Sequence, residues 1–280
     1  MKIERVAQHF KAAGDLFACP KCQSPARCQG ASFICAQGHC YDLSRRGYVN
    51  FAPEAGATKY TAELFDARRE ILEAGFYRPA AEAILRAVAE TSPAPKLLDA
   101  GCGEGYYAGF LKQALPEAQV LAADLSKAAV MAAARHYSDI LAMVADLARL
   151  PLRDASMDAL INVLTPANYK EFFRVLKPGG RLVKVIPGEH YLEEIRSRLK
   201  GKLSRDSFSN AQVLAHIQAQ TRVIHRETLH YTLPVTETQA ARFLAMTPMT
   251  FNISDKKQVT PDFETITIHL ELLVCLAPEG

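Results

Sequence analysis

Three alternating glycines behind an acidic residue form the first group that could do chemistry. Asp99, Gly101, Gly103 and Gly105 follow a short apolar run, and a helical pattern starts at Tyr106. Glycine has no Cβ atom, so the backbone of such a turn can bend sharply and a ligand can lie directly against it. The pattern predicts a strand, a tight turn and a helix N-terminus, with a ligand at the turn.

Two cofactors compete for this turn. A glycine-rich turn after a first strand binds the pyrophosphate of a dinucleotide in one fold family and S-adenosylmethionine in another. The spacing here is G-x-G-x-G rather than G-x-G-x-x-G, and Asp99 and Glu104 would repel a pyrophosphate. A second acid, Asp124, ends the next apolar run, where a carboxylate can accept both hydroxyls of a ribose. The two acids favour S-adenosylmethionine, and a merely tight turn is the alternative.

A cluster of cysteines near the N-terminus has the spacing of metal ligands. Cys19, Cys22, Cys35 and His39 stand in the pattern C-x2-C-x12-C-x3-H. Two ligand pairs, each on a turn, can converge on one tetrahedral zinc ion, which thiolates and an imidazole suit. Cys40 stands beside His39 and can replace it as the fourth ligand. A site closed by four protein ligands does no chemistry, so we expect a structural Zn2+.

The chain after residue 95 alternates between strand and helix patterns. This alternation predicts an α/β fold with a parallel sheet covered on both faces. Site residues are expected where the strands end, because ligands bind beyond their carboxyl ends. Asp146 stands where an adenine amino group would be contacted, and the segment from Asn162 to Asn168 faces the expected methyl-transfer centre. The expected strands are 96–100, 119–123, 140–145, 157–163 and 180–186, with two long strands at 221–233 and 263–276 that complete a seven-stranded, Rossmann-like methyltransferase sheet.

Length and composition indicate one large and one small unit. The 280 residues are 49% apolar and 22% charged, and the formal net charge of +3 permits a nucleic-acid partner without demanding one. We divide the chain into a zinc-binding RNA-recognition unit (1–51), a linker with helices (52–95) and the methyltransferase domain (96–280). No apolar run reaches membrane-spanning length and no signal peptide is visible, so we expect a cytoplasmic protein with no membrane partner.

Aromatic residues set among basic ones are the reason to assign RNA recognition to the first unit. Tyr41, Tyr48 and Phe51 lie in sequence close to four cationic side chains, and aromatics next to cations are typical of RNA-binding surfaces. The alternative is that these aromatics form the core of the unit. A basic run from residue 198 to 205 is a second candidate, either for RNA contact or as a solvated loop.

The combination of motifs resembles the large-subunit ribosomal RNA guanine-N1 methyltransferases of the RlmA type. The resemblance covers nearly the full length and rests chiefly on the Cys-Pro-x-Cys zinc unit joined to the Asp-x-Gly-Cys-Gly-Glu-Gly-Tyr-Tyr motif at 99–107. It extends to Gly-Tyr-Val-Asn (47–50), Ala-Arg-Arg (67–69), Val-Leu-Lys-Pro-Gly-Gly (175–180) and Met-Thr-Pro (246–248).

The resemblance implies methyl transfer from S-adenosylmethionine to N1 of a guanine in a hairpin loop of large-subunit (23S) ribosomal RNA. It also implies a homodimer, an RNA-binding role for the zinc unit, and cofactor contacts by Tyr77, Tyr107, Ala108 and the segment around His190 and Tyr191. Ala167-Asn168 replaces a small residue and Cys found in some members. That variation resembles the Gram-positive subgroup, some of which methylate a neighbouring guanine and contribute to macrolide resistance.

The proton on guanine N1 must leave as the methyl group arrives, so a general base or a water path is needed. His190, near the end of the fifth strand, and Asp158 are the candidates. His190 has the alternative role of contacting the cofactor, and Asp158 that of capping its strand.

Two other functions remain open at this stage. One is a methyltransferase for a small metabolite or antibiotic precursor, with the zinc unit as a lid, which activity dependent on ribosomal RNA would exclude. The other is a zinc-containing binding module that uses the Rossmann-like domain as a scaffold without a cofactor. The three glycines, Asp99 and Asp124 argue against this function.

Overall fold

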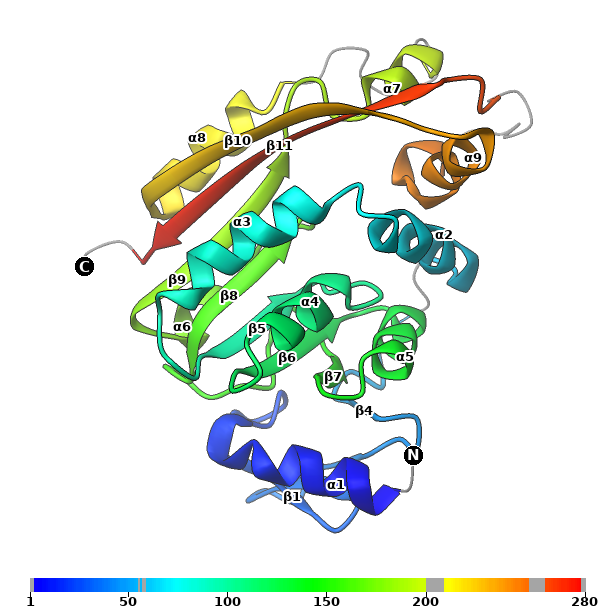
Figure 1. Cartoon of the computed structure of the whole chain (residues 1–280). Coiled ribbons are helices and arrows are strands. Elements are labelled where there is room, and N and C mark those ends of the chain that lie inside the picture. Colours follow the sequence, from blue (N-terminus) through cyan, green and yellow to red (C-terminus); the bar gives the residue numbers. More distant parts are fainter. Residues whose placement is uncertain (1–2, 55, 57–58, 200–208, 252–259, 278–280) are drawn as a thin grey trace.

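The large sheet has eight strands and carries helices on both faces (Figure 1). The structure is a computed structural model, and it describes residues 3–54, 56, 59–199, 209–251 and 260–277. The large sheet has the order β10-β11-β9-β8-β5-β6-β7-β4, and a separate sheet has the order β1-β2-β3. The described strands are β1 (Ala26–Gln29), β2 (Ser32–Cys35), β3 (Cys40–Asp42), β4 (Tyr48–Asn50), β5 (Lys96–Ala100), β6 (Gln119–Asp124), β7 (Leu141–Val144), β8 (Met157–Val163), β9 (Leu176–Pro187), β10 (Arg222–Pro234) and β11 (Thr265–Leu276). The described helices are α1 (Ile3–Ala12), α2 (Ala62–Glu73), α3 (Arg78–Ala89), α4 (Tyr106–Ala114), α5 (Lys127–His136), α6 (Tyr169–Val175), α7 (Glu193–Arg198), α8 (Ala211–Gln220) and α9 (Glu237–Met246), with short 3-10 helices η1 (Gly14–Leu16) and η2 (Pro248–Thr250).

All seven expected strands are present, and β9 departs most from its expected bounds. It begins at Leu176 instead of residue 180, because Leu176 already pairs with Met157 before the regular ladder resumes at Arg181. After β9, Leu192 takes a left-handed backbone conformation (φ 54°), and α7 starts directly after it.

The eighth strand comes from the segment that we had assigned to the zinc unit. β4 pairs in parallel with β7, with Val49 opposite Met143. A strand of three residues is too short to show a hydrophobic period, which is why the sequence predicted seven strands and not eight. The first 51 residues are therefore joined to the catalytic sheet through a shared ladder.

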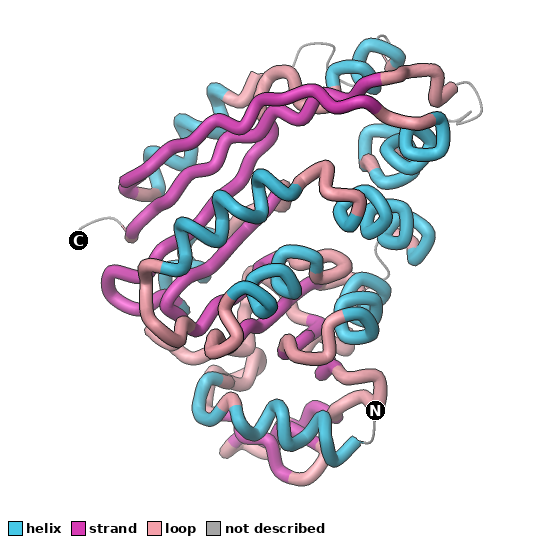
Figure 2. The backbone as a smooth tube through the Cα atoms, viewed as in Figure 1, coloured by secondary structure: helices cyan, strands magenta, loops and turns pink. Residues whose placement is uncertain are grey.

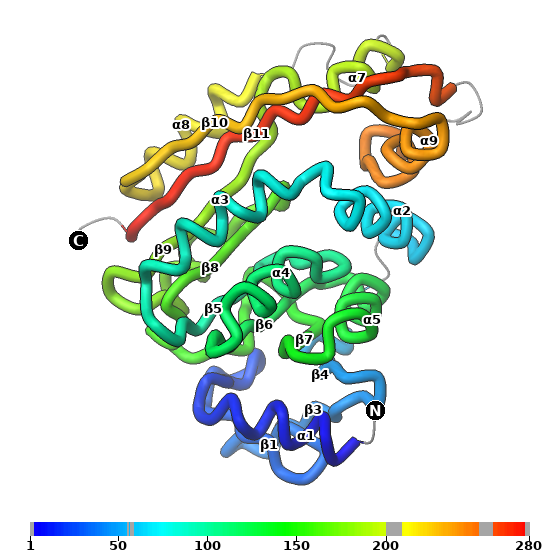
Figure 3. Tube along the Cα trace, viewed as in Figure 1, coloured from blue at the N-terminus to red at the C-terminus, as the bar shows by residue number. Residues whose placement is uncertain are grey.

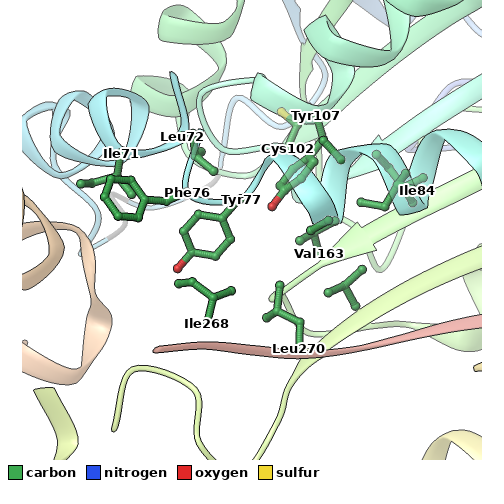
Figure 4. Packing of buried hydrophobic residues seen from close by; sticks show 14 of the residues in the cluster. Ile71, Leu72, Phe76, Tyr77, Ile84, Cys102, Tyr107, Val163, Ile268 and Leu270 are labelled. Atoms are coloured by element: carbon green, nitrogen blue, oxygen red, sulfur yellow. The ribbon is translucent and has the colours of Figure 1, made fainter. Parts of the chain in front are cut away.

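Helices lie over the large sheet (Figure 2), and its strands bury side chains on both faces. Along β9, Val183 and Val185 belong to the core under α3, α4, α7 and α9, while Leu182 and Ile186 belong to the core under α6, α8 and the N-terminal unit. Near-continuous apolar runs are typical of strands covered on both sides. Figure 4 shows part of the first core, where Tyr77 approaches Ile268 of β11.

The chain reverses direction around β5, the centre of the site. From β5 it passes to β6 and β7 on one side, and then returns to β8 and β9 on the other. Ligands of open α/β sheets bind outside the carboxyl ends of the strands at such a switch point.

Two helices that are far apart in the sequence pack together near this edge. α2 and α9 lie side by side (Figure 3), and Glu70 and Arg242 form an ion pair between them with an O–N distance of 2.7 Å. This contact brings the segments around residues 68 and 246 to the same end of the sheet.

The N-terminal unit has an aromatic core. The rings of Phe17 and Phe33 are 4.6 Å apart, and Phe33 and Phe51 are 5.3 Å apart. Tyr41, Tyr48 and Phe51 are all buried. Of the two interpretations of these aromatics, the one that places them in the protein core is therefore confirmed, because their side chains fill the interior.

The basic run at 198–205 lies mostly outside the described residues. Only Arg198 and Leu199 are described, and Arg198 binds Asp262 through an Nε–Oδ1 hydrogen bond of 2.6 Å. Among the described helices, none has the length and apolar character needed to cross a membrane.

Candidate active site

The glycine turn joins β5 to α4 and leaves backbone open to a ligand. Gly101 and Gly103 have left-handed backbones, with φ of +86° and +55°. A Cβ on Gly101 would lie 2.7 Å from Oγ1 of Thr165, so the loop after β8 packs directly on the turn. A Cβ on Gly103 would come no closer than 3.8 Å to its neighbours, the nearest of which belong to Arg68 and Phe65.

Two buried carboxyl groups flank the turn. Asp99 and Glu104 are each 1% exposed, and among the described residues Oδ2 of Asp99 has no hydrogen-bond partner. Burial raises the pKa of Asp99 to about 7, against the opposing effects of Arg68 and of the backbone of Ala108. Arg68 of α2 pairs with Glu104, with an Nε–Oε1 distance of 3.3 Å. A buried carboxyl oxygen without a partner fits a ligand that brings a cation or a donor.

The next two strand ends also present carboxyl groups. Oδ2 of Asp124 accepts a hydrogen bond from the backbone of Gly103 (2.9 Å), and Oδ1 accepts one from Ser126 (2.8 Å). Burial raises the pKa of Asp124, while these two N–H groups oppose the rise. Asp146 follows β7 and is exposed, and its Oδ1 accepts from the backbone of Ala148 at 2.8 Å. The three acids therefore lie along the carboxyl edges of β5, β6 and β7.

A cavity of about 610 Å³ opens at this edge of the sheet. Its walls come from the ends of the central strands, from α2, and from the segment 246–249 after α9. The volume is in the range of cofactor and substrate sites. Seven of the predicted cofactor residues line it: Tyr77, Gly101, Gly103, Tyr107, Asp124, Asp146 and Tyr191.

The four predicted zinc ligands converge in the N-terminal unit. The ligand atoms of Cys19, Cys22, Cys35 and His39 all lie within 4.8 Å of one another, and the Sγ atoms of Cys22 and Cys35 are 3.8 Å apart. Tetrahedral zinc with Zn–S bonds of about 2.3 Å places two sulfurs roughly 3.8 Å apart. Cys40 is exposed and its Sγ is directed to Asp42, 3.9 Å away. The donor set fits Zn2+ with His39, and not Cys40, as the fourth ligand.

Comparison with known proteins identifies the family. Residues 17–55 match the family model "RlmA, N-terminal", a zinc ribbon, and residues 97–180 match the model "Methyltransferase domain". A protein of Bacillus subtilis (strain 168), YxjB, provisionally named a 23S rRNA (guanine-N(1)-)-methyltransferase, is 33% identical over 92% of this chain and 96% of its own length. The chain belongs to the RlmA-type 23S rRNA (guanine-N1)-methyltransferases. The 23S rRNA (guanine(748)-N(1))-methyltransferase of Streptomyces fradiae is 29% identical over 92% of this chain and 95% of its own length.

The fold of this RlmA-type enzyme is that of S-adenosylmethionine-dependent methyltransferases. A solved geranyl diphosphate methyltransferase in complex with SAM matches with a TM-score of 0.50 at 19% identity, over 80% of this chain and 97% of that chain. The predicted fold class is confirmed: an α/β methyltransferase sheet with a small N-terminal zinc-binding unit.

Two tyrosines that the RlmA resemblance singled out meet in the cavity wall. The hydroxyls of Tyr77 and Tyr191 are 2.7 Å apart, although the residues stand 114 positions apart in the chain. Tyr107 lines the same cavity from the first turn of α4. The rings of Tyr77 and Tyr107 are buried and that of Tyr191 is partly buried, and all three line the cavity.

Four predicted cofactor residues are not among those that line the cavity: Asp99, Gly105, Ala108 and Asn162. Asp99 is buried at the end of β5. Gly105 packs α4 on α5, because a Cβ there would be 2.8 Å from that of Ala133. Ala108 is fully buried and acts through its backbone, which hydrogen-bonds Asp99. Asn162 is also fully buried, and its amide donates to the carbonyl of Ala100 at 2.7 Å.

Neither candidate for the general base of this RlmA-type enzyme lies in the cavity wall. Asp158 stands at the start of β8, the opposite edge of the sheet, where it accepts from Lys96 N (2.8 Å) and pairs with Lys177 (2.6 Å). Four residues of strand, about 13 Å, separate it from Asn162 at the other end. His190 is half exposed, directs Nδ1 to Glu193 at 2.8 Å, and stacks on His269. The geometry therefore speaks against both assignments.

Sequence reasoning missed several residues that line the cavity. Arg68 lies on α2, and Met246 to Met249 come from a distant segment. The motifs Ala-Arg-Arg and Met-Thr-Pro were visible signals, but only the packing of α2 on α9 shows that they meet at the site.

Proposed function

We propose that this protein methylates N1 of a guanine in a hairpin loop of 23S ribosomal RNA. The observation that carries the proposal is the conjunction, in one chain, of the converging Cys3His cluster and the acid-lined cavity at the switch point of the sheet. S-adenosylmethionine would supply the methyl group as a sulfonium-bound electrophile. The N1 atom lies on the Watson–Crick edge, so an unpaired loop base suits the reaction.

The chain's own residues would hold the cofactor in named ways. Asp124 would accept the ribose hydroxyls, and Asp146 the adenine amino group. The backbone of Gly101 and Gly103 would lie against the amino-acid part, with Asp99 beside its ammonium group. Tyr77, Tyr107 and Tyr191 would form the apolar wall around it.

The proton of guanine N1 needs an acceptor, and we infer that this is water. Among the described lining residues the carboxyl groups are Asp124 and Asp146, and both are assigned to the cofactor. Positioning of the base and the cofactor in line would then supply most of the rate enhancement.

We propose guanine 748 as the target position, because the Streptomyces fradiae relative named for that guanine aligns over 92% of this chain. A homodimer and a contribution to macrolide resistance stay predictions from the family resemblance, and a cytoplasmic location stays a prediction from the sequence. Light scattering of the purified protein tests the first, and macrolide susceptibility of a deletion strain tests the second.

Transfer of a tritiated methyl group to unmodified large-subunit RNA tests the proposal. We expect incorporation into that RNA and none into small-subunit RNA, with D124N as the inactive control. Cofactor binding without transfer to free RNA or to assembled subunits would contradict the RNA assignment, and would favour a small metabolite or antibiotic precursor as the substrate.

A further inference from the structure

A buried lysine lies under the loop that follows β8. Lys184 of β9 is 4% exposed and stands opposite Asn162 in the parallel ladder between β8 and β9. Its Nζ donates hydrogen bonds to Oδ1 of Asn162 and to the backbone carbonyl of Thr165. Burial lowers the pKa of Lys184 to about 8.

This lysine takes part in no ion pair within the described part of the chain. A buried ammonium group without a carboxylate partner costs free energy, and apolar residues of the same size would be at least as stabilising. Its two hydrogen-bond acceptors are Asn162, at the end of β8, and Thr165, in the loop that follows. Hydrogen bonds to this loop therefore offset the free-energy cost of burying the ammonium group.

The loop held by Lys184 has a constrained shape. Leu164 adopts a left-handed backbone (φ 54°), which is unfavourable for a residue with a Cβ, and its N–H donates to the carbonyl of Val185 at 3.0 Å. The amide of Asn162 donates to Oγ1 of Thr165 at 2.6 Å, and Thr165 packs on Gly101. Lys184 thus connects β9, through the end of β8, to the glycine turn.

The same loop forms a wall between two cavities. Leu164, Thr165, Pro166 and Ala167 line both the 610 Å³ cavity and a second one of about 300 Å³ on the other side. Lys184 lines only the second cavity, together with Tyr169 of α6 and His216 of α8. Its ammonium group therefore supports the loop from behind and does not touch the space assigned to the cofactor.

We propose that Lys184 is a positioning residue for methyl transfer, which fixes the Leu164–Ala167 loop against the glycine turn so that the acceptor base is held in line with the methyl group. The proposal rests on the proposed function. Misplacement of reacting groups by about 1 Å can cost a hundredfold in rate, so loss of this support should lower the rate of transfer more than the binding of either ligand.

The variant K184M removes the ammonium group and keeps an unbranched side chain as far as Cε. We expect at least a tenfold lower kcat for RNA methylation, with cofactor Kd and RNA KM changed by less than about threefold. K177M is the matched control, because Lys177 is a lysine at the opposite edge of the sheet, bound to Asp158 and outside both cavities. Its kcat should equal that of the wild type.

Chemical rescue of kcat distinguishes a specific role of the Lys184 ammonium group from a general contribution of the side chain to packing. K184A removes the atoms of a propylamine next to the 300 Å³ cavity, so propylamine should restore kcat with a saturable dependence. Propanol, of similar size but without a charge, should not. If K184M does not fold, K184R takes its place and should retain more activity than K184A.

Equal kcat for K184M and K177M would overturn the proposal, as would equal rescue by propylamine and propanol. Hydrogen exchange of the peptide spanning residues 163–170 gives a readout that needs no RNA. Faster exchange in K184M than in K177M is expected, and identical exchange would contradict the support of the loop. A wild-type protein that methylates no RNA would instead refute the proposed function, and hydrogen exchange would still decide what Lys184 does.

Discussion

Asp124 both stabilises the glycine turn and lines the cavity assigned to the cofactor. Both of its oxygens already accept backbone hydrogen bonds, from Gly103 and Ser126, and the side chain still lines the cavity. Each carboxylate oxygen has a second lone pair, so the same group can hold the turn and accept a hydroxyl of the ligand.

Replacement of Asp124 by Asn should therefore weaken cofactor binding strongly. Hydrogen bonds to a charged acceptor contribute about 1.5–3 kcal/mol, which corresponds to roughly a 10- to 150-fold loss of affinity for S-adenosylmethionine in calorimetry. D139N changes an exposed aspartate away from the cavity and serves as the control. Wild-type affinity in D124N would contradict the assignment.

Asp99 gives the protein without cofactor a predicted dependence of stability on pH. Its pKa is raised to about 7 in the folded state, so the folded state holds a proton that the unfolded state releases near pH 4. The stabilisation is fully present below about pH 4 and is lost as the pH rises through about 7. Between these values the free energy of unfolding should fall by up to about 1.4 kcal/mol per pH unit.

The variant D99N lacks this titration, and urea unfolding between pH 5 and pH 8 measures the difference. The wild-type stability should fall relative to that of D99N as the pH rises. A constant difference across the range would mean that Asp99 is already ionised in the folded protein at pH 5.

At the scale of single residues, the sequence predicted the chemical role of a side chain better than its position relative to the cavity. The acids at the carboxyl ends of β5, β6 and β7 were predicted correctly as strand-end residues, because an apolar run that stops at an acid marks the edge of a parallel sheet. This rule does not apply to an acid at the start of a strand. Asp158 is such a residue, and it lies at the edge of the sheet opposite the cavity. His190 follows its strand, but its ring stacks on that of His269 and it is not among the residues that line the cavity.

At the scale of elements, the zinc ribbon depends on a metal that its small core cannot replace. The unit has one ten-residue helix and a sheet of three short strands, and its fourth short strand, β4, belongs to the large sheet. Structural zinc contributes several kcal/mol or more to the folding of such units. Removal of one ligand should therefore release the metal and lower the melting temperature.

C35S tests the ligand set, with C40S as the matched control. We expect C35S to lose its zinc, measured by mass spectrometry of the metal content, and to melt at a lower temperature. C40S should keep the metal, because His39 and not Cys40 lies with the other three ligand atoms. Zinc loss in C40S and retention in an alanine variant of His39 would reverse the assignment.

The elements that the sequence predicted are those with long, regular patterns. The central strands are buried on both faces and read as apolar runs, and α2, α3 and α5 show caps or turn signals at their ends. β4 was missed because its three residues carry no period. The contact of α2 with α9, which brings Arg68 and Met246 to the cavity, is a tertiary fact that no local pattern contains.

At the scale of the whole molecule, the zinc ribbon and the catalytic cavity are connected through β4. This strand runs parallel to β7, so its carboxyl end lies at the edge of the sheet where the cavity opens. From there the chain leads to Tyr60 and α2, which line the cavity. An RNA hairpin bound by the ribbon would therefore be held by the same rigid sheet that holds the cofactor.

The central claim is that the methyl group goes to N1 of a single guanine, and primer extension on 23S ribosomal RNA tests it most directly. A methyl group on N1 blocks the Watson–Crick edge, so reverse transcriptase should stop at one hairpin-loop guanine, position 748, after treatment with the wild-type protein and not with D124N. Tritium incorporation without any such stop, or a stop at a different kind of base, would contradict the account.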